Sequence, residues 1–86
     1  MLTVSEHSTL TAVYTAEATG VYTFAISTTV TNGHGDWRVE SRKVGETSDG
    51  PSGSFSAYME YGDVLYHQGS ECQLAGYRIG NEFEDP

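Results

Sequence analysis

The sequence predicts an all-β fold, an antiparallel β-sandwich of jelly-roll type with seven to eight short strands. Short β-prone runs alternate apolar and polar residues with a period of two, and turn residues separate these runs. No window of fifteen residues shows an apolar stripe at helical spacing. Runs of short strands without helices are typical of sandwiches and barrels. We therefore expect one domain over residues 1–86.

The N-terminal part of the chain gives two strand signals. Residues 2–10 alternate weakly, whereas residues 9–18 place Thr and Val around Tyr14 and end in a bend of small residues. The opening MLTVSEHSTL lacks the basic start and apolar run of a secretory signal, and no run is long enough to span a membrane. We therefore expect a protein that is made in the cytoplasm of its host cell.

The longest β-prone run is GVYTFAISTTV, residues 20–30. Its period of two places Tyr22, Phe24, Ile26 and Val30 on one face and mostly Thr and Ser on the other. The aromatic face should be buried and the hydroxyl face should meet water.

Asn32-Gly33 is a strong hairpin signal, because both residue types accept positive φ. The chain should reverse there, and residues 37–44 should return as the antiparallel partner of residues 20–30. On this returning strand, one face should carry Trp37 and Val39, and the other Arg38, Glu40 and Arg42.

The second half continues the pattern of strands and turns. Residues 45–53, GETSDGPSG, have loop composition, and we expect an exposed loop. The segments that follow are a strand at 54–61, a tight turn at Gly62-Asp63 in which the Asp63 carboxylate accepts backbone N–H bonds, strands at 64–68 and 74–79, and an acidic tail at 81–86 that should fray.

Charge and size limit the possible partners. Twelve acidic and four basic residues give a net charge of −8, which disfavours nucleic acid and anionic membranes. A domain of 86 residues buries only about two-thirds of the surface that its unfolded chain exposes. The single cysteine, Cys72, excludes an intrachain disulfide and should be a small apolar filler. Self-association is therefore the expected source of added stability.

Three stretches occur in an order that resembles a known family: YTAEATGVYTF (14–24), SGSFSAYMEYGDVLYHQ (52–68) and LAGYRI (74–79). In this order they resemble the globular heads of the C1q and tumour necrosis factor superfamily. Those heads have a G-x-Y-x-F strand after a small-residue bend, a Ser-Gly-Ser stretch before a strand that ends in Gly-Asp, and an aromatic-small-Gly-aromatic closing strand. The chain is shorter than such a head, and Arg78 departs from the pattern. The resemblance implies a jelly-roll homotrimer with aromatic residues packed about its axis and a binding or structural role.

The candidate site residues are aromatic rings and polar loop residues. Tyrosine combines a large apolar area with a polar tip and suits interfaces and sugar stacking, although most of these rings should fill the sandwich core or the trimer axis. The interface candidates are Tyr22, Phe24, Trp37, Tyr58, Tyr61, Tyr66 and Tyr77, and the candidates for exposed loop contacts are His34, Asp36 and Asp49.

Neither a metal site nor a cofactor is predicted. His34, Asp36 and Glu40 have poor metal spacing and fit a hairpin tip, and the acidic tail should be solvated rather than bound to calcium. His7 and His67 look isolated, so we expect surface or interface groups that titrate near neutral pH. No G-x-S-x-G elbow occurs, so no enzymatic activity is expected.

These observations favour a virion structural protein: a trimeric decoration or cement protein that docks on the capsid protein of a phage, with no signal peptide because particles assemble inside the cell. Two alternatives stay open. One is the receptor- or glycan-binding adhesin tip of a phage fibre, which would use exposed aromatic residues. The other is an acidic inhibitor that mimics nucleic acid, which would align carboxylates on one face.

Overall fold

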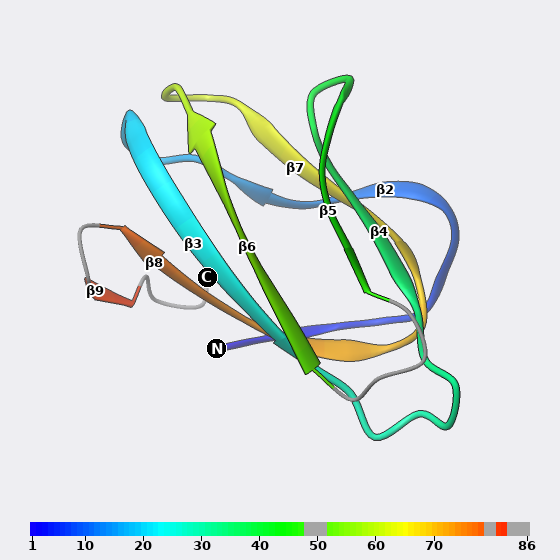
Figure 1. The fold of residues 1–86 in the computed structure, drawn as a ribbon. Helices are drawn as coiled ribbons and strands as arrows, with labels where there is room; N and C mark the ends of the chain where they lie inside the picture. Colours follow the sequence, from blue (N-terminus) through cyan, green and yellow to red (C-terminus); the bar gives the residue numbers. More distant parts are fainter. Residues whose placement is uncertain (48–51, 79–80, 83–86) are drawn as a thin grey trace.

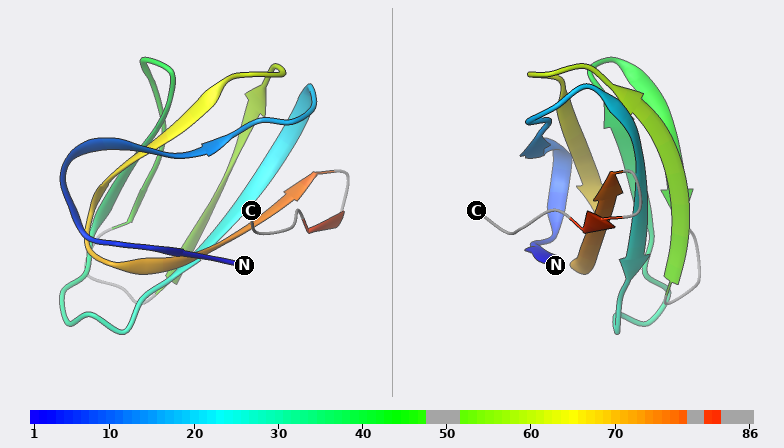
Figure 2. Two further views of the ribbon diagram at one scale, coloured as in Figure 1. Left: turned by 180° about the vertical axis from the view of Figure 1, so that it is seen from behind. Right: turned by 90° about the vertical axis from the view of Figure 1, so that its left-hand side faces the viewer.

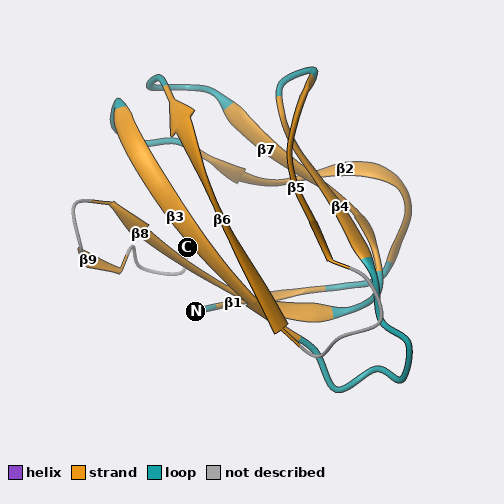
Figure 3. Cartoon of the chain, in the orientation of Figure 1, coloured by secondary structure: helices purple, strands orange, loops and turns teal. Residues whose placement is uncertain are grey.

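The computed structural model describes residues 1–47, 52–78 and 81–82, which form two facing antiparallel sheets (Figure 1, Figure 3). The predicted all-β antiparallel sandwich is confirmed. No described segment forms a helix that is long and apolar enough to cross a membrane. The strands are β1 (Leu2–Val4), β2 (His7–Thr15), β3 (Gly20–Ser27), β4 (Gly35–Val39), β5 (Arg42–Thr47), β6 (Ser52–Met59), β7 (Val64–Gly69), β8 (Cys72–Arg78) and β9 (Asn81–Glu82).

Each sheet combines strands from distant parts of the chain. Sheet A has the order β1-β8-β3-β6, with β9 also paired to β8, and sheet B has the order β2-β7-β4-β5. The chain passes between the sheets at every connection except β4–β5 and β8–β9, and the two layers are visible edge-on in the right view of Figure 2. This interleaved order of eight strands is that of a jelly roll.

The core lies between the sheets and follows from the period-two pattern. Along β3, Tyr22, Phe24 and Ile26 are buried, whereas Val21 and Thr23 are exposed. The predicted burial of the aromatic face of this strand is therefore confirmed. The largest fully buried side chains are Trp37, Tyr22, Phe24, Met59, Leu65, Leu74, His67 and Val39.

The predicted hairpin between residues 20–30 and 37–44 is wrong. Strand β3 ends at Ser27 and pairs with β6 and β8, whereas β4 belongs to the other sheet. The chain does turn near Asn32, whose φ is 57°, and Gly33 N donates to Val30 O at 3.1 Å. The turn carries the chain from one sheet to the other, because β3 is a central strand and has both of its edges occupied.

Two further boundaries differ from the prediction. Residues 37–44 are split by a turn at Glu40, where φ is 55°, and form the end of β4 and the start of β5. All described residues of the predicted loop 45–53 belong to strands, since β5 reaches Thr47 and β6 begins at Ser52. Gly45 is partly buried. The Phe55 ring lies so close to it that an added Cβ would overlap the ring. Residues 48–51 lie outside the described residues.

The tight turn at Gly62-Asp63 is confirmed. Asp63 N donates to Glu60 O at 2.9 Å, and the Asp63 carboxylate accepts a bond from Glu60 N at 3.0 Å, as predicted. At the C-terminal end, Asn81 and Glu82 pair with β8 as β9, so the segment that was expected to fray begins with a short strand. Residues 83–86 lie outside the described residues.

The corner between β7 and β8 depends on Gly69. Its φ of 144° is unfavourable for other residues, and an added Cβ would lie 2.7 Å from Gly35 Cα and still closer to His34 O. Ser70 N donates to His34 O at 2.8 Å on the same corner. Backbone from two segments, 34–35 and 69–70, therefore meets where a side chain has no room.

Substitution Gly69→Ala should lower the free energy of unfolding by at least about 3 kcal/mol, because it combines backbone strain with a backbone clash. Gly62→Ala is the matched control, since Gly62 has a φ of 89° but open space around a Cβ, and should cost about 1 to 2 kcal/mol. Urea unfolding followed by Trp37 fluorescence measures both. Equal losses would show that the close approach at Gly69 is unimportant.

Candidate functional site

The outward face that β1, β3, β6 and β8 form in sheet A has side chains without formal charge. Along β3, the residues between the buried ones point outward, and their register partners on β6 and β8 share that face. None of these side chains is charged, although the chain has twelve acidic and four basic residues. This surface, called the A face below, comprises Met1, Thr3, Val21, Thr23, Ala25, Ser27, Ser54, Ser56, Tyr58, Gln73, Ala75 and Tyr77.

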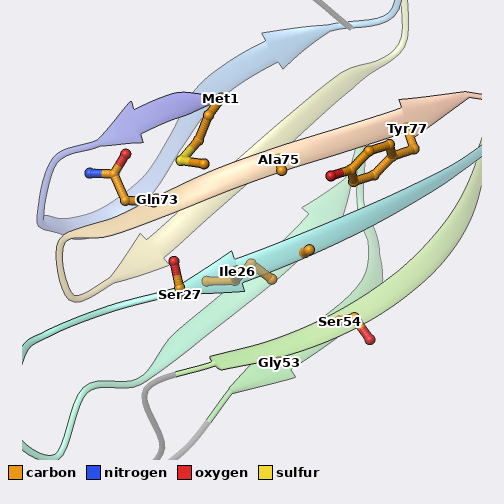
Figure 4. A pocket seen from close by; sticks show the side chains of 9 residues that line it. Met1, Ile26, Ser27, Gly53, Ser54, Gln73, Ala75 and Tyr77 are labelled. Atoms are coloured by element: carbon orange, nitrogen blue, oxygen red, sulfur yellow. The ribbon is translucent and has the colours of Figure 1, made fainter. Parts of the chain in front are cut away.

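The centre of the A face is hollow because its side chains are small. A groove of about 500 Å³ lies over Ala25, Ala75 and Ser54, and Ala75 lies between Met1 and Tyr77 in the close-up of Figure 4. The exposed fractions of the Val21 and Tyr58 side chains, 59% and 48%, show that apolar groups on the same face also meet solvent. The groove is thus a shallow, largely apolar depression with hydroxyl groups along it.

Cross-strand hydrogen bonds organise the hydroxyl groups of the A face. The side-chain oxygens of Thr23 and Ser56 lie 3.0 Å apart, and Thr3 Oγ1 donates to Gln73 Oε1 at 3.1 Å. These bonds satisfy polar groups within the face itself. The face can therefore be covered by another surface with a smaller desolvation cost than a charged face would incur.

Sheet B differs, because its outward face carries an ion-pair cluster. Arg38 Nε donates to Asp36 Oδ2 at 3.2 Å, and Lys43 Nζ lies 4.0 Å from Asp36 Oδ1 and 3.0 Å from Glu46 Oε2. Asp36 and Arg38 alternate with the buried Trp37 and Val39 of β4, so they point away from the core. Their register partners on β5 are Glu46 and Lys43. The two outer faces of the sandwich therefore have opposite character.

A second cluster, the histidine corner, brings together all three histidines of the chain, His7, His34 and His67. The Nδ1 atoms of His7 and His67 lie 3.1 Å apart, and the His67 ring centroid lies 4.4 Å from that of Trp37. His34 belongs to the same corner through its backbone, since its N donates to Ser70 Oγ at 3.2 Å. His67 is fully buried, and its Nε2 atom has no hydrogen-bond partner in the described part of the chain.

The pKa of His67 is lowered from 6.5 to about 4, first by burial and second by the positive charge that His7 can carry. Asp36 opposes this shift and His34 adds a smaller contribution in the same direction as His7. Within residues 1–47, 52–78 and 81–82, no three His, Cys, Asp or Glu side chains form a group that could hold a metal ion. The short contact of the two imidazoles is an N–H···N hydrogen bond, in which one Nδ1 donates and the other accepts.

The structure separates the predicted interface residues into two groups. Tyr22, Phe24 and Trp37 are at most 1% exposed and lie between the sheets, so their assignment to an intermolecular contact is corrected to the core of the single chain. The remaining four reach the surface on different parts of the fold: Tyr58 and Tyr77 on the A face, Tyr66 on the outer face of sheet B, and Tyr61 in the turn after β6.

The three polar residues predicted as exposed loop contacts, His34, Asp36 and Asp49, have different outcomes. His34 is exposed in the connection before β4, as predicted, whereas Asp36 lies within β4 in the ion-pair cluster and is not a loop residue. Asp49 lies outside the described residues. The expectation that His67 is a surface group near neutral pH is wrong, because it is buried and contacts His7 from sixty residues away.

The A face has a signal in the sequence, which is the absence of charged residues from three stretches. Residues 18–33, 50–59 and 72–77 contain no Asp, Glu, Lys or Arg. Each of these stretches contributes a strand to sheet A, β3, β6 and β8 in turn, and together these strands make most of the A face, while the edge strand β9 pairs Glu82 with Tyr77. The pairing of His7 with His67 left no comparable sequence signal.

Comparisons of the chain with family models, with curated proteins and with solved structures find no match.

The stability of the protein should fall on acidification because of His67. The unfolded chain binds a proton at this residue near pH 6.5 and the folded chain only near pH 4, so the unfolded state holds more protons between these values. The contribution of His67 is fully present above pH 6.5 and declines by roughly 1.4 kcal/mol per pH unit towards pH 4.

Urea unfolding at pH 7.5, 6.5, 5.5 and 4.5 measures this dependence. His67→Gln should remove most of the slope over this range, whereas His34→Gln, which changes an exposed ring at the same corner, should keep it. An unchanged slope in His67→Gln would contradict the assignment.

The thiol of Cys72 should be unreactive in the folded protein. Burial raises its pKa to about 11, with a smaller contribution from Glu71, so little thiolate exists at pH 8. Modification by Ellman's reagent should be at least about a hundredfold slower than in the urea-unfolded chain. Comparable rates in the two states would show that Cys72 is accessible, contrary to its place in the core.

Proposed function

We propose that this protein is a non-enzymatic structural module that assembles with copies of itself through the A face and decorates the surface of a virion. The observation that carries the proposal is the uncharged A face on a chain of net charge −8. The centres of protein interfaces are depleted in charged residues and enriched in aromatic residues and Met. Tyr58, Tyr77 and Met1 belong to the A face and fit this composition.

Size and shape also support self-association. A domain of 86 residues has a small core, and covering an exposed apolar surface adds stability. The groove over Ala25 and Ala75 would receive a projecting side chain of a neighbouring copy, and the exposed Val21 and Tyr58 are available for this contact. By contrast, an approach through the sheet B face would require the Asp36 cluster to lose water.

The resemblance to C1q and tumour necrosis factor heads supplies the expected number of subunits, which is three. It also supports a role in binding or in holding assemblies together rather than in catalysis. In the proposed setting, the trimer docks on the capsid protein of a phage, and the acidic surface outside the A face meets complementary charges of the shell.

A second candidate function is glycan binding, which the same groove favours. Tyr77 lines one end of the groove, and the hydroxyl groups of Ser27 and Ser54 and the amide of Gln73 line it further along; a groove that combines an aromatic ring with such groups suits a sugar. A glycan array separates the two functions, since the adhesin requires a free A face and binding that Tyr77→Ala abolishes. Self-association through that face would instead leave the array without signal.

Ser54→Arg should weaken self-association at least tenfold, because it places a charged side chain in the groove of the A face. Ala12→Arg is the matched control, since Ala12 is exposed on β2 in sheet B, and should leave the association unchanged. Sedimentation velocity from 1 to 100 µM measures both variants against the natural chain. A natural chain that stays monomeric, or equal effects of the two variants, would contradict the proposed interface.

The virion setting has a test of its own. The protein should copurify with intact particles from infected cells, and particles stripped of it should lose resistance to heat. Absence from purified particles would exclude a decoration protein while leaving the sedimentation result for the A face valid.

A further inference from the structure

The histidine corner lies where the chain passes twice between the sheets. On the sheet A side Val4 pairs with Cys72, and on the sheet B side His7 pairs with Gly69. The β1–β2 and β7–β8 connections therefore run side by side, and the contact between the His7 and His67 rings joins them just inside sheet B. The ring contact thus joins the first residue of β2 to β7 next to both connections.

The first part of β2 is weakly held. Its register with β7 shifts between His7 and Thr11, so the residues between these two positions lack regular pairing. The described hydrogen bond that holds this stretch is exposed, from Gln68 Nε2 to Ser8 O at 2.8 Å. The ring contact of His7 is thus an important anchor for residues 5–10.

A hydrogen bond between two Nδ1 atoms needs one proton between them. With both rings neutral, one Nδ1–H donates and the other Nδ1 accepts, and a first added proton leaves this bond intact. A second proton would place two N–H donors and two positive charges 3.1 Å apart. The contact is therefore compatible with at most one imidazolium ion.

If both imidazoles were charged, the surroundings of His67 would offer its ring no other hydrogen-bond acceptor. Its Nε2 atom is buried without an acceptor, and the neighbouring Trp37 offers only an N–H donor, which is also unpartnered in the described residues. The titratable groups that act on His67 are His7 on β2, His34 before β4 and Asp36 on β4, of which only Asp36 favours the charge. Beyond the corner, Glu71 acts on the Cys72 thiol, which stays neutral in acid.

We propose that the His7–His67 pair is an acid-sensitive latch: when both imidazoles are protonated, the Nδ1–Nδ1 bond breaks and residues 5–10 separate from β7 while the rest of the sandwich stays folded. This proposal does not depend on the proposed function, because it concerns the single chain. The open form hydrates the edge of the core at Trp37 and frees the β1–β2 connection.

Hydrogen exchange of the full chain, measured by NMR between pH 7 and 3.5 and expressed as protection factors, tests the latch. Protection of the amides of residues 5–10 should fall at least tenfold on acidification, while the amides of β3 stay protected. Trp37, the single tryptophan, should change its fluorescence over the same pH range, because its ring contacts that of His67.

Two variants decide the cause. His7→Gln keeps a side chain that can accept from protonated His67, so residues 5–10 should keep at least tenfold more protection than in the natural chain at pH 4. His34→Gln is the matched control and should respond like the natural chain. Uniform loss of protection across all strands, or the same response in His7→Gln as in the natural chain, would overturn the proposal.

Discussion

A row of rings between the two sheets is the contact on which the rest of the structure depends. Tyr22 and Phe24 stack with centroids 6.0 Å apart, and Phe55 lies 5.2 Å from Phe24 and 5.8 Å from Trp37. His67 continues the row 4.4 Å beyond Trp37. These rings come from both sheets, so the same contacts join the layers and fill the core. A small domain has few large side chains, and those that lie between the sheets cannot also lie on the outer faces.

Period-two patterning could predict the strands and their buried sides, because burial of alternate residues is local information. It could not predict which strands pair. Leu2, for example, pairs with Leu74, far along the chain. Asn32-Gly33 does not form the predicted hairpin, because β3 pairs along its length with β6 and β8 instead. A favourable turn contributes little compared with two full ladders of hydrogen bonds and the burial that accompanies them.

The candidate sites were less predictable than the fold for the same reason. Composition suggested an aromatic interface, yet Tyr22, Phe24 and Trp37 are the core, and small side chains such as Ala25 and Ser54 make the uncharged face. Charge-free stretches mark that face in the sequence, but only the sheet order brings them together. The histidine pair could not be foreseen, because a contact between residues sixty positions apart depends on where two connections cross.

The distribution of charge links the acidic composition to the A face. Several carboxylates, those of Glu40, Glu60 and Asp63 among them, gather around the turn before β7, where Val64 N donates to Glu40 Oε2 and Glu60 N to Asp63 Oδ2. Two bodies of charge −8 repel one another, but at physiological ionic strength the repulsion is screened over about 8 Å. If two copies meet through the A face, their acidic ends would lie more than this screening distance apart or at the rim of the contact. The same repulsion would then oppose every other approach, so the net charge would restrict the copies to one mode of contact.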